Sequence, residues 1–288
     1  MASPSIQKPA LAAAVAAARA AGRVMCANLR REKKVNVATH HDIKLELDVR
    51  CQKIIERILR RAFPTIPILG EEGILGDPEA ATRWVVDPID GTVNFTYGIP
   101  HACVSIALQS RDPARTGRRP QKSGRLDESD FDTLVGVVYD PFTDEMWTAI
   151  RGQKALLNGT PIHVSRRTTI TEAIVALGFA KEKHTLEKML PTLHRLIARV
   201  RKIRIMGAAA LSLVYVGTGR MDGYIEYGLR LWDIAAAGLI VECAGGVFWR
   251  KPVAGDYAYK MVASNRPLAA DLRKLAKAEA GDRAPRQS

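Results

Sequence analysis

The segment from Trp84 to Phe95, with the sequence WVVDPIDGTVNF, constrains the fold more than any other stretch of the chain. Its apolar, β-rich start predicts a short buried strand, and Pro88 predicts that the chain turns directly after it. Asp87 and Asp90 would then lie at the strand end and in the turn. Two carboxylates this close repel each other unless a positive charge lies between them, and Mg²⁺ prefers oxygen ligands of this kind. A plain surface turn is the alternative, because Asp, Pro and Gly are ordinary turn residues.

Gly91 and Thr92 follow the second of these aspartates. Glycine lets another group approach the backbone closely, and the N–H groups at the start of a helix attract phosphate. An acidic pair followed by such a phosphate cradle predicts metal-assisted phosphoryl chemistry.

Two further acidic motifs lie elsewhere in the chain. Residues 68–73, ILGEEG, place Glu71 and Glu72 at the end of another predicted strand. Residues 231–238, LWDIAAAG, place Asp233 at the start of an apolar helix, where N-capping is its alternative role. Adjacent acidic groups in a loop are usually solvated, so neither motif predicts a metal site by itself.

The three motifs together resemble the inositol monophosphatase family, which shares a superfamily with the fructose-1,6-bisphosphatases. The family pattern of G-E-E, then D-P-[IL]-D-G-T-x-N, then W-D-x-A-A-G occurs here in order. The resemblance runs from about residue 10 to about residue 265 and implies an α/β fold, a layered αβαβα sandwich. We therefore expect an α+β half at 1–165 that binds metal and phosphate, an α/β substrate half at 166–280, and a disordered tail at 281–288.

The resemblance also implies roles for the acidic residues. Two or three Mg²⁺ ions would be held by four carboxylates and one backbone carbonyl, those of Glu71, Asp87, Asp90, Asp233 and Ile89. The backbone N–H groups of Gly91 and Thr92 would hold the phosphate. Thr92, Asp48 and Glu71 would be the catalytic residues that position and activate the attacking water.

Asp48 has a structural alternative. The family has D-x-V-T-x-x-D before a helix, and Asp42 and Asp48 keep this spacing, although Lys44 and Leu45 replace Val-Thr. Asp48 opens a predicted helix that runs to about Phe63, so helix capping explains it equally well without the family.

The predicted substrate contacts also come from the resemblance. Glu226, seven residues before Asp233, falls where the family has a glutamate that contacts inositol. Gly207 and Ala208 fall where many members have Gly-Thr or Gly-Ser, so a hydroxyl contact to the substrate would be missing. We expect Mg²⁺-dependent hydrolysis of small phosphate monoesters, and inositol monophosphate is the favoured substrate. A fructose-1,6-bisphosphatase or another sugar-phosphate phosphatase is the alternative.

The net charge of +13 and the pI of about 9.8 leave a different class of function open. Basic residues gather at 111–125, inside a Pro- and Gly-rich segment, 110–132, that is longer than the hairpin of the family. A surface loop explains this insertion most simply, and a basic arm over the site or on an anionic partner is the other interpretation. An RNA- or transcription-complex-binding protein that keeps the fold is therefore the less favoured hypothesis.

The remaining expectations concern compartment and assembly. No apolar run approaches the roughly 20 residues that span a bilayer. The alanine-rich start carries Lys8, Arg19 and Arg23, which argues against a secretory segment. An organelle transit segment is one interpretation of this start, and the family resemblance favours the first helix of the fold instead. Four cysteines without C-x-x-C spacing predict buried thiols in a cytoplasmic protein rather than a zinc site. A homodimer is implied only by the family.

Hydrophobic periodicity predicts the elements around these motifs. In the first half, helices are expected at 10–32 and 48–63, and strands at 66–69, 84–86, 102–108, 133–139 and 145–149. In the second half, strands are expected at 174–179, 202–206, 222–227, 247–250 and 261–264, and helices at 182–200, from 207, 233–244 and 267–280. The helix at 182–200 carries Leu186, Leu190, Leu193 and Ile197 at helical spacing, which predicts a core or dimer face.

Overall fold

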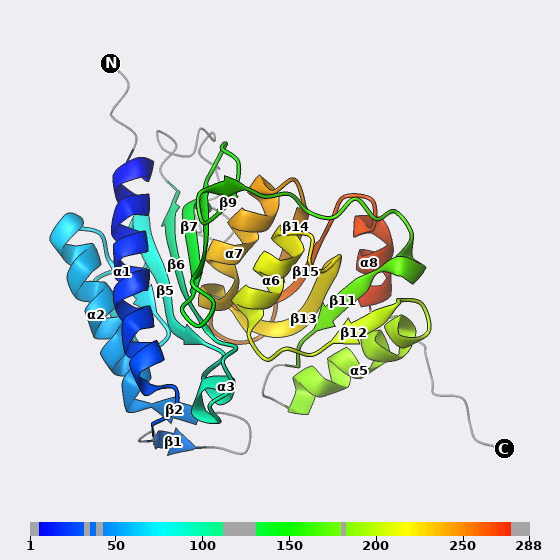
Figure 1. Ribbon diagram of the computed structural model, residues 1–288, viewed down its shortest axis with the longest axis horizontal. Coiled ribbons are helices and arrows are strands. Elements are labelled where there is room, and N and C mark those ends of the chain that lie inside the picture. Colours follow the sequence, from blue (N-terminus) through cyan, green and yellow to red (C-terminus); the bar gives the residue numbers. More distant parts are fainter. Residues whose placement is uncertain (1–5, 32–34, 39–42, 112–130, 180–182, 278–288) are drawn as a thin grey trace.

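The computed structural model describes residues 6–31, 35–38, 43–111, 131–179 and 183–277. Two sheets alternate with three layers of helices, as Figure 1 shows. The helical layers, from the outer side of the first sheet to the outer side of the second, are α1 (Gln7–Asn28) with α2 (Glu46–Ala62), α6 (Ala209–Gly217) with α7 (Leu231–Cys243), and α5 (Lys183–Ile197) with α8 (Ala269–Ala276). This order confirms the predicted αβαβα sandwich.

The first sheet has eight strands in the order β10-β9-β8-β7-β6-β5-β3-β4. Neighbours are antiparallel except β3 and β5, which run parallel. The strands are β3 (Ile68–Gly70), β4 (Gly73–Leu75), β5 (Thr82–Asp90), β6 (Cys103–Ser110), β7 (Asp132–Asp140), β8 (Glu145–Ile150), β9 (Leu156–Leu157) and β10 (Thr160–Pro161). A small hairpin, β1 (Val35–Ala38) and β2 (Ile43–Leu45), leads into α2. The sheet gives the site a rigid floor, because its central strands β5, β6 and β7 are buried over almost their whole length.

The second sheet has five strands in the order β12-β11-β13-β15-β14. Its strands are β11 (Ile174–Leu177), β12 (Lys202–Arg204), β13 (Gly223–Arg230), β14 (Val247–Pro252) and β15 (Ala258–Ser264), and a single 3₁₀ turn, η2 (Ile170–Glu172), precedes β11. Strand β11 pairs in parallel with both β12 and β13. Strand β15 pairs antiparallel with both β13 and β14. Successive residues of β11 face opposite layers: Val175 and Leu177 join the core under α5 and α8, and Ala176 joins the core under α6 and α7.

Helix α7 lies between the two sheets and is apolar on every side. Its residues from Ile234 to Val241 are all buried, which fits a helix that has protein on both faces. Small side chains let it approach β7 closely, since a Cβ at Gly136 would lie 2.6 Å from the Ala236 carbonyl oxygen. Helix α7 therefore packs directly against the first sheet.

The predicted turn at Pro88 is wrong in detail. Strand β5 continues through Pro88 to Asp90, and its pairing with β6 shifts register between Asp87 and Asp90. Pro88 lacks an N–H group for the ladder, and a bulge is one of the few places where a strand accepts proline. The bulge replaces the turn and still separates the two aspartates.

The buried face of α5 is not the predicted leucine stripe, so the core interpretation of that stripe is wrong and the dimer face stays a prediction. Leu186 and Leu190 are 43% and 40% exposed, and the buried positions of the described helix are Thr185, Met189, Thr192 and Leu196. The true face is one residue behind the predicted one, because threonine can enter a core and leucine can remain outside it. Only Leu193 of the predicted stripe packs partly against the core, together with Leu196.

Helix α1 corrects the expectation that no apolar segment is long enough to span a bilayer. Among the described residues it is the one helix long and apolar enough to cross a membrane by length and composition, with a mean hydropathy of 1.4 over an 18-residue window. In this fold one face of the helix is fully buried and belongs to the core that includes Cys51 and Tyr139. The alanines of this face are Ala10, Ala14, Ala17, Ala18 and Ala21.

The cysteines are all free, and only two are fully buried. Cys51 and Cys103 are buried as predicted, Cys243 is half-buried, and Cys26 is exposed. The expectation of a buried thiol is therefore wrong for Cys26, which lies near the end of α1 and contacts the Pro141 carbonyl at 3.0 Å.

Candidate metal and phosphate site

The end of β5 supplies two buried aspartates. Asp87 is 1% exposed, and its Oδ1 accepts a hydrogen bond from the backbone N–H of Ile89 at 3.0 Å. Asp90 is also buried and points toward the second half of the molecule, where the N–H groups of Ala209 and Ala210 donate to it at 3.1 and 2.8 Å. Asp90 therefore caps the first turn of α6 from another layer of the fold.

Asp233 comes from the first turn of α7. Sequence reasoning allowed it to be the N-cap, but Arg230 occupies that position and Asp233 is the third helical residue. Its Oδ2 accepts the backbone N–H of Arg230 at 2.7 Å, so it caps the helix from inside the first turn. Ser105 of β6 donates to the Trp232 carbonyl at 3.0 Å, which anchors this turn on the first sheet.

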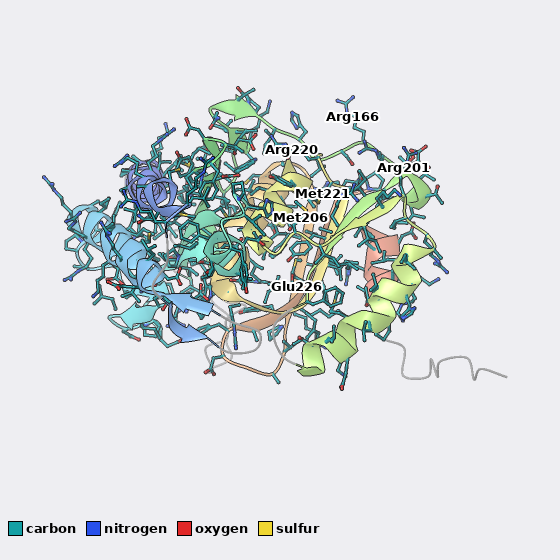
Figure 2. The ribbon with its side chains drawn as sticks, turned by 60° about the horizontal axis from the view of Figure 1, so that its bottom comes forward. Arg166, Arg201, Met206, Arg220, Met221 and Glu226 are labelled. Carbon is teal, nitrogen blue, oxygen red and sulfur yellow. The ribbon has the colours of Figure 1, made fainter. Side chains whose placement is uncertain are left out.

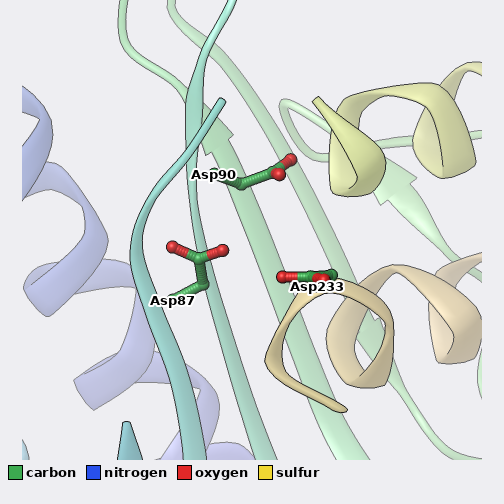
Figure 3. Close-up of side chains that lie close together, drawn as sticks. All are labelled: Asp87, Asp90 and Asp233. Atoms are coloured by element: carbon green, nitrogen blue, oxygen red, sulfur yellow. The ribbon is translucent and has the colours of Figure 1, made fainter. Parts of the chain in front are cut away.

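The three aspartates meet at one point, as Figure 3 shows. Asp87, Asp90 and Asp233 each offer an oxygen, and these oxygens all lie within 4.8 Å of one another. Glu71, which follows β3, is hydrogen-bonded to Asp87. Three of the predicted metal ligands therefore form one cluster, and a fourth lies against it.

The electrostatics of this cluster favour a bound cation. Burial, followed by the charge of Glu71, raises the pKa of Asp87 well above its usual value, and the charges of Asp90 and Asp233 add to the effect. Burial raises the pKa of Asp90 to about 6, although the N–H groups of α6 act against it. In the described part of the chain, no ion pair to Asp87 or Asp90 offsets this repulsion. An all-oxygen set of crowded carboxylates, with Asp87 and Asp90 buried and Asp233 half-buried, fits a hard divalent cation such as Mg²⁺.

The predicted phosphate cradle lies directly beside the aspartates. Gly91 has a left-handed conformation with φ of 89° and precedes the short helix α3 (Thr92–Thr96). A Cβ there would lie 2.9 Å from the carbonyl oxygen of His101 and 3.1 Å from the Ala208 side chain, so only glycine fits. The Thr92 hydroxyl donates to the Ile89 carbonyl at 2.9 Å, which places a predicted catalytic group and a predicted ligand next to each other.

Asp48 is 3% exposed and is the third residue of α2, which begins at Glu46 rather than at Asp48 as predicted. It lies in the first turn of the helix, where a carboxylate is favourable. Asp42, its predicted companion in the motif, lies outside the described residues.

The predicted substrate residues differ in their exposure. Glu226 on β13 is buried and accepts a hydrogen bond from the Tyr224 hydroxyl. Gly207 is exposed with φ of 76°, but the Ala208 side chain is buried over Gly91. A contact from this position would therefore come from the backbone of Gly207.

Sequence reasoning missed four contributors to the site. The N–H groups of α6 and the Cys103 thiol, 3.6 Å from Asp90, contact an aspartate that is distant in sequence. Asn94 donates to the carbonyls of His101 and Met206 at 3.0 and 2.9 Å, which ties α3 to the second half. Only Tyr224 had a local signal, because residues two apart in a strand share a face.

Comparison with known proteins agrees with this geometry. A model of the inositol monophosphatase family matches residues 6–117 and 130–283. The chain belongs to this family. Inositol monophosphatase from Mesembryanthemum crystallinum is 35% identical over 270 residues, which are 91% of this chain and 93% of the plant protein.

Other members of the inositol monophosphatase family carry a different name. Nus factor SuhB from Pseudomonas aeruginosa is 38% identical over 248 residues, which are 83% of this chain and 84% of that protein. The crystal structure of extragenic suppressor protein suhB from Bartonella henselae has a TM-score of 0.79 and 32% identity, and covers 92% of this chain and 97% of that one. The predicted resemblance is thus confirmed over nearly the whole chain.

Proposed function

We propose that this member of the inositol monophosphatase family hydrolyses small phosphate monoesters with Mg²⁺, and that inositol monophosphates are its preferred substrates. The observation that supports this most is the convergence of Asp87, Asp90 and Asp233 within 4.8 Å. The left-handed turn at Gly91 lies next to them and presents backbone N–H groups to an anion. Metal ligands and a phosphate cradle at one point are what metal-assisted phosphoryl transfer requires.

In this proposal each residue has a defined task. Glu71, Asp87, Asp90 and Asp233 hold the ions with their carboxylates, and Ile89 adds its carbonyl. Bound Mg²⁺ would polarise the phosphoryl group and lower the pKa of water.

The remaining groups bind and orient. The N–H groups of Gly91 and Thr92 hold the phosphate, and the Thr92 hydroxyl, with Asp48, orients the attacking water. Glu226 contacts a hydroxyl of the leaving alcohol. The chain needs no covalent nucleophile, because the water attacks phosphorus directly.

Phosphate release tests the proposal. Purified protein would be given inositol 1-phosphate, fructose 1,6-bisphosphate, histidinol phosphate and adenosine 3′,5′-bisphosphate, each with Mg²⁺ or with chelator. Asp90→Asn should lose several kcal/mol of transition-state stabilisation, which is at least about 100-fold in rate. Asp271→Asn, on the exposed side of α8, is the matched control and should keep full activity. Folded, Mg²⁺-loaded protein that releases no phosphate from any substrate would contradict the proposal.

A second candidate is a role in a transcription complex. Its support is the +13 net charge and the name of relatives such as Nus factor SuhB. Apart from Arg111, the basic cluster at 111–125 lies outside the described residues. An RNA mobility shift that weakens steeply between low and high salt would support this candidate. Phosphatase activity in the same preparation would show that both roles coexist.

We also propose that two or three ions bind per subunit and that the protein forms a homodimer. The half at 1–165 would supply the metal and phosphate contacts, and the half at 166–280 the substrate contacts. Metal analysis after desalting and sedimentation velocity would measure the number of ions and the oligomeric state.

A further inference from the structure

Strand β13 carries two buried polar side chains whose arrangement the proposed chemistry does not explain by itself. Tyr224 is 2% exposed and Glu226 is 6% exposed. They are two residues apart in a strand, so their side chains lie on the same face of the sheet. The Tyr224 hydroxyl donates a hydrogen bond to Oε2 of Glu226. Figure 2 shows Glu226 on β13 near the middle of the molecule.

The backbone next to the neighbouring strand also limits the Glu226 carboxylate. A Cβ at Gly178, just after β11, would collide with the Glu226 carboxylate. The N–H of Gly178 donates to the Ile225 carbonyl at 3.3 Å, which holds this backbone in place. Oε2 of Glu226 is thus close both to a tyrosine hydroxyl and to a glycine backbone, and both restrict the rotation of the carboxylate.

The same pair borders the acidic cluster. Burial, followed by the charge of Glu226, raises the pKa of Tyr224 well above its usual value, and the charges of Asp90 and Asp233 also contribute. The phenol therefore stays protonated and remains a hydrogen-bond donor at neutral pH. A donor in a fixed position favours one orientation of the Glu226 carboxylate.

We propose that Tyr224 is a positioning residue, whose hydroxyl fixes the Glu226 carboxylate in the orientation that accepts a hydroxyl group of the substrate alcohol. The inference rests on the proposed function, in which Glu226 contacts the substrate. It goes further in one respect: selection for hydroxyl-bearing alcohols depends on a tyrosine that does not itself touch the substrate. For a phosphate ester without such hydroxyls, KM should not depend on Tyr224.

The test compares two substrates in the Tyr224→Phe variant, which removes one oxygen and keeps the ring. For inositol 1-phosphate we expect KM to rise about 3- to 10-fold, the value of one hydrogen bond, with kcat within about twofold. For phenyl phosphate, whose leaving group has no hydroxyl besides the one released, KM should stay within about 1.5-fold. Tyr259→Phe is the matched control, because Tyr259 is equally buried on the adjacent strand β15. It should leave KM unchanged for both substrates.

A double-mutant cycle separates positioning from a merely structural role. In a Glu226→Ala background, Tyr224→Phe should add no further change in KM for inositol 1-phosphate, because the acceptor that Tyr224 orients is already gone. Additive effects, or equal KM changes for both substrates in Tyr224→Phe, would overturn the inference. Wild-type protein that hydrolyses neither substrate would instead refute the proposed function, so the two failures are distinguishable.

Discussion

Asp90 links the two halves of the molecule through one side chain. It belongs to the cluster with Asp87 and Asp233, and its oxygens also accept the N–H groups of Ala209 and Ala210. Sequence reasoning selected Asp90 as a metal ligand, and this stays a prediction. It could not find the second role, because the partners are 119 and 120 positions away and meet only in the folded chain.

Gly91→Ala should destabilise the protein more than the same change at Gly152. Both glycines have positive φ, 89° and 83°, so alanine costs about 1–2 kcal/mol of backbone strain at either position. At Gly91 the new methyl group would also meet the His101 carbonyl and Ala208, whereas nothing lies within 4 Å at Gly152. We expect a further loss of about 1–3 kcal/mol at Gly91, measured by urea unfolding. Equal losses for the two variants would show that the turn is not tightly packed.

At the scale of elements, local patterns predicted most helices and strands correctly. Apolar runs before Glu71 and Asp87 located the strands, and the uniformly apolar run after Asp233 located α7. The errors arose where neighbours decide the outcome. Strand β5 passes Pro88 because β6 accommodates a bulge, and α5 buries Met189 rather than Leu190 because its orientation follows the sheet beneath it.

The contact between α7 and β7 should tolerate no added methyl group. In Gly136→Ala the new Cβ would lie 2.6 Å from the Ala236 carbonyl, and backbone atoms of a buried helix cannot move aside cheaply. We expect a loss of at least about 1–3 kcal/mol in the free energy of unfolding. Gly217→Ala is the control, since its nearest neighbour would be at 3.4 Å and the residue ends helix α6. That variant should be neutral or gain up to about 1 kcal/mol.

At the scale of the whole molecule, the fold brings like charges together at a cost. Asp87 and Asp90 come from the first sheet, and Asp233 comes from the helix between the sheets. Burial and mutual repulsion raise the pKa values of Asp87 and Asp90. From the sequence, the convergence of these three aspartates could be predicted only through the family resemblance. No local pattern encodes the packing of α7 against β6 and β7.

The metal-free protein should therefore lose part of its stability as the pH rises. The pKa of Asp90 is raised from 3.8 to about 6 in the folded state, so between these values the folded state binds more protons than the unfolded state. By linkage, Asp90 contributes to the free energy of unfolding below about pH 4, and this contribution is lost as the pH rises through about 6. Its size is on the order of 3 kcal/mol.

Urea unfolding in chelator, from pH 4 to pH 7.5, measures this effect as the difference between wild type and Asp90→Asn. We expect the wild type to lose stability relative to the variant as the pH rises. Saturating Mg²⁺ should restore stability, and more strongly at pH 7.5 than at pH 5, because the ligands must be deprotonated. A relative stability that increases with pH would contradict the raised pKa.

The most direct measurement is the rate of phosphate release from inositol 1-phosphate as Mg²⁺ is titrated into metal-free protein, for wild type, Asp233→Asn and Asp271→Asn. If the two halves of the molecule hold the ions together, wild type and Asp271→Asn should gain activity with Mg²⁺. Asp233→Asn should remain folded and at least about 100-fold slower at saturating metal. Activity in chelator, or an Asp233→Asn variant as fast as wild type, would contradict the account.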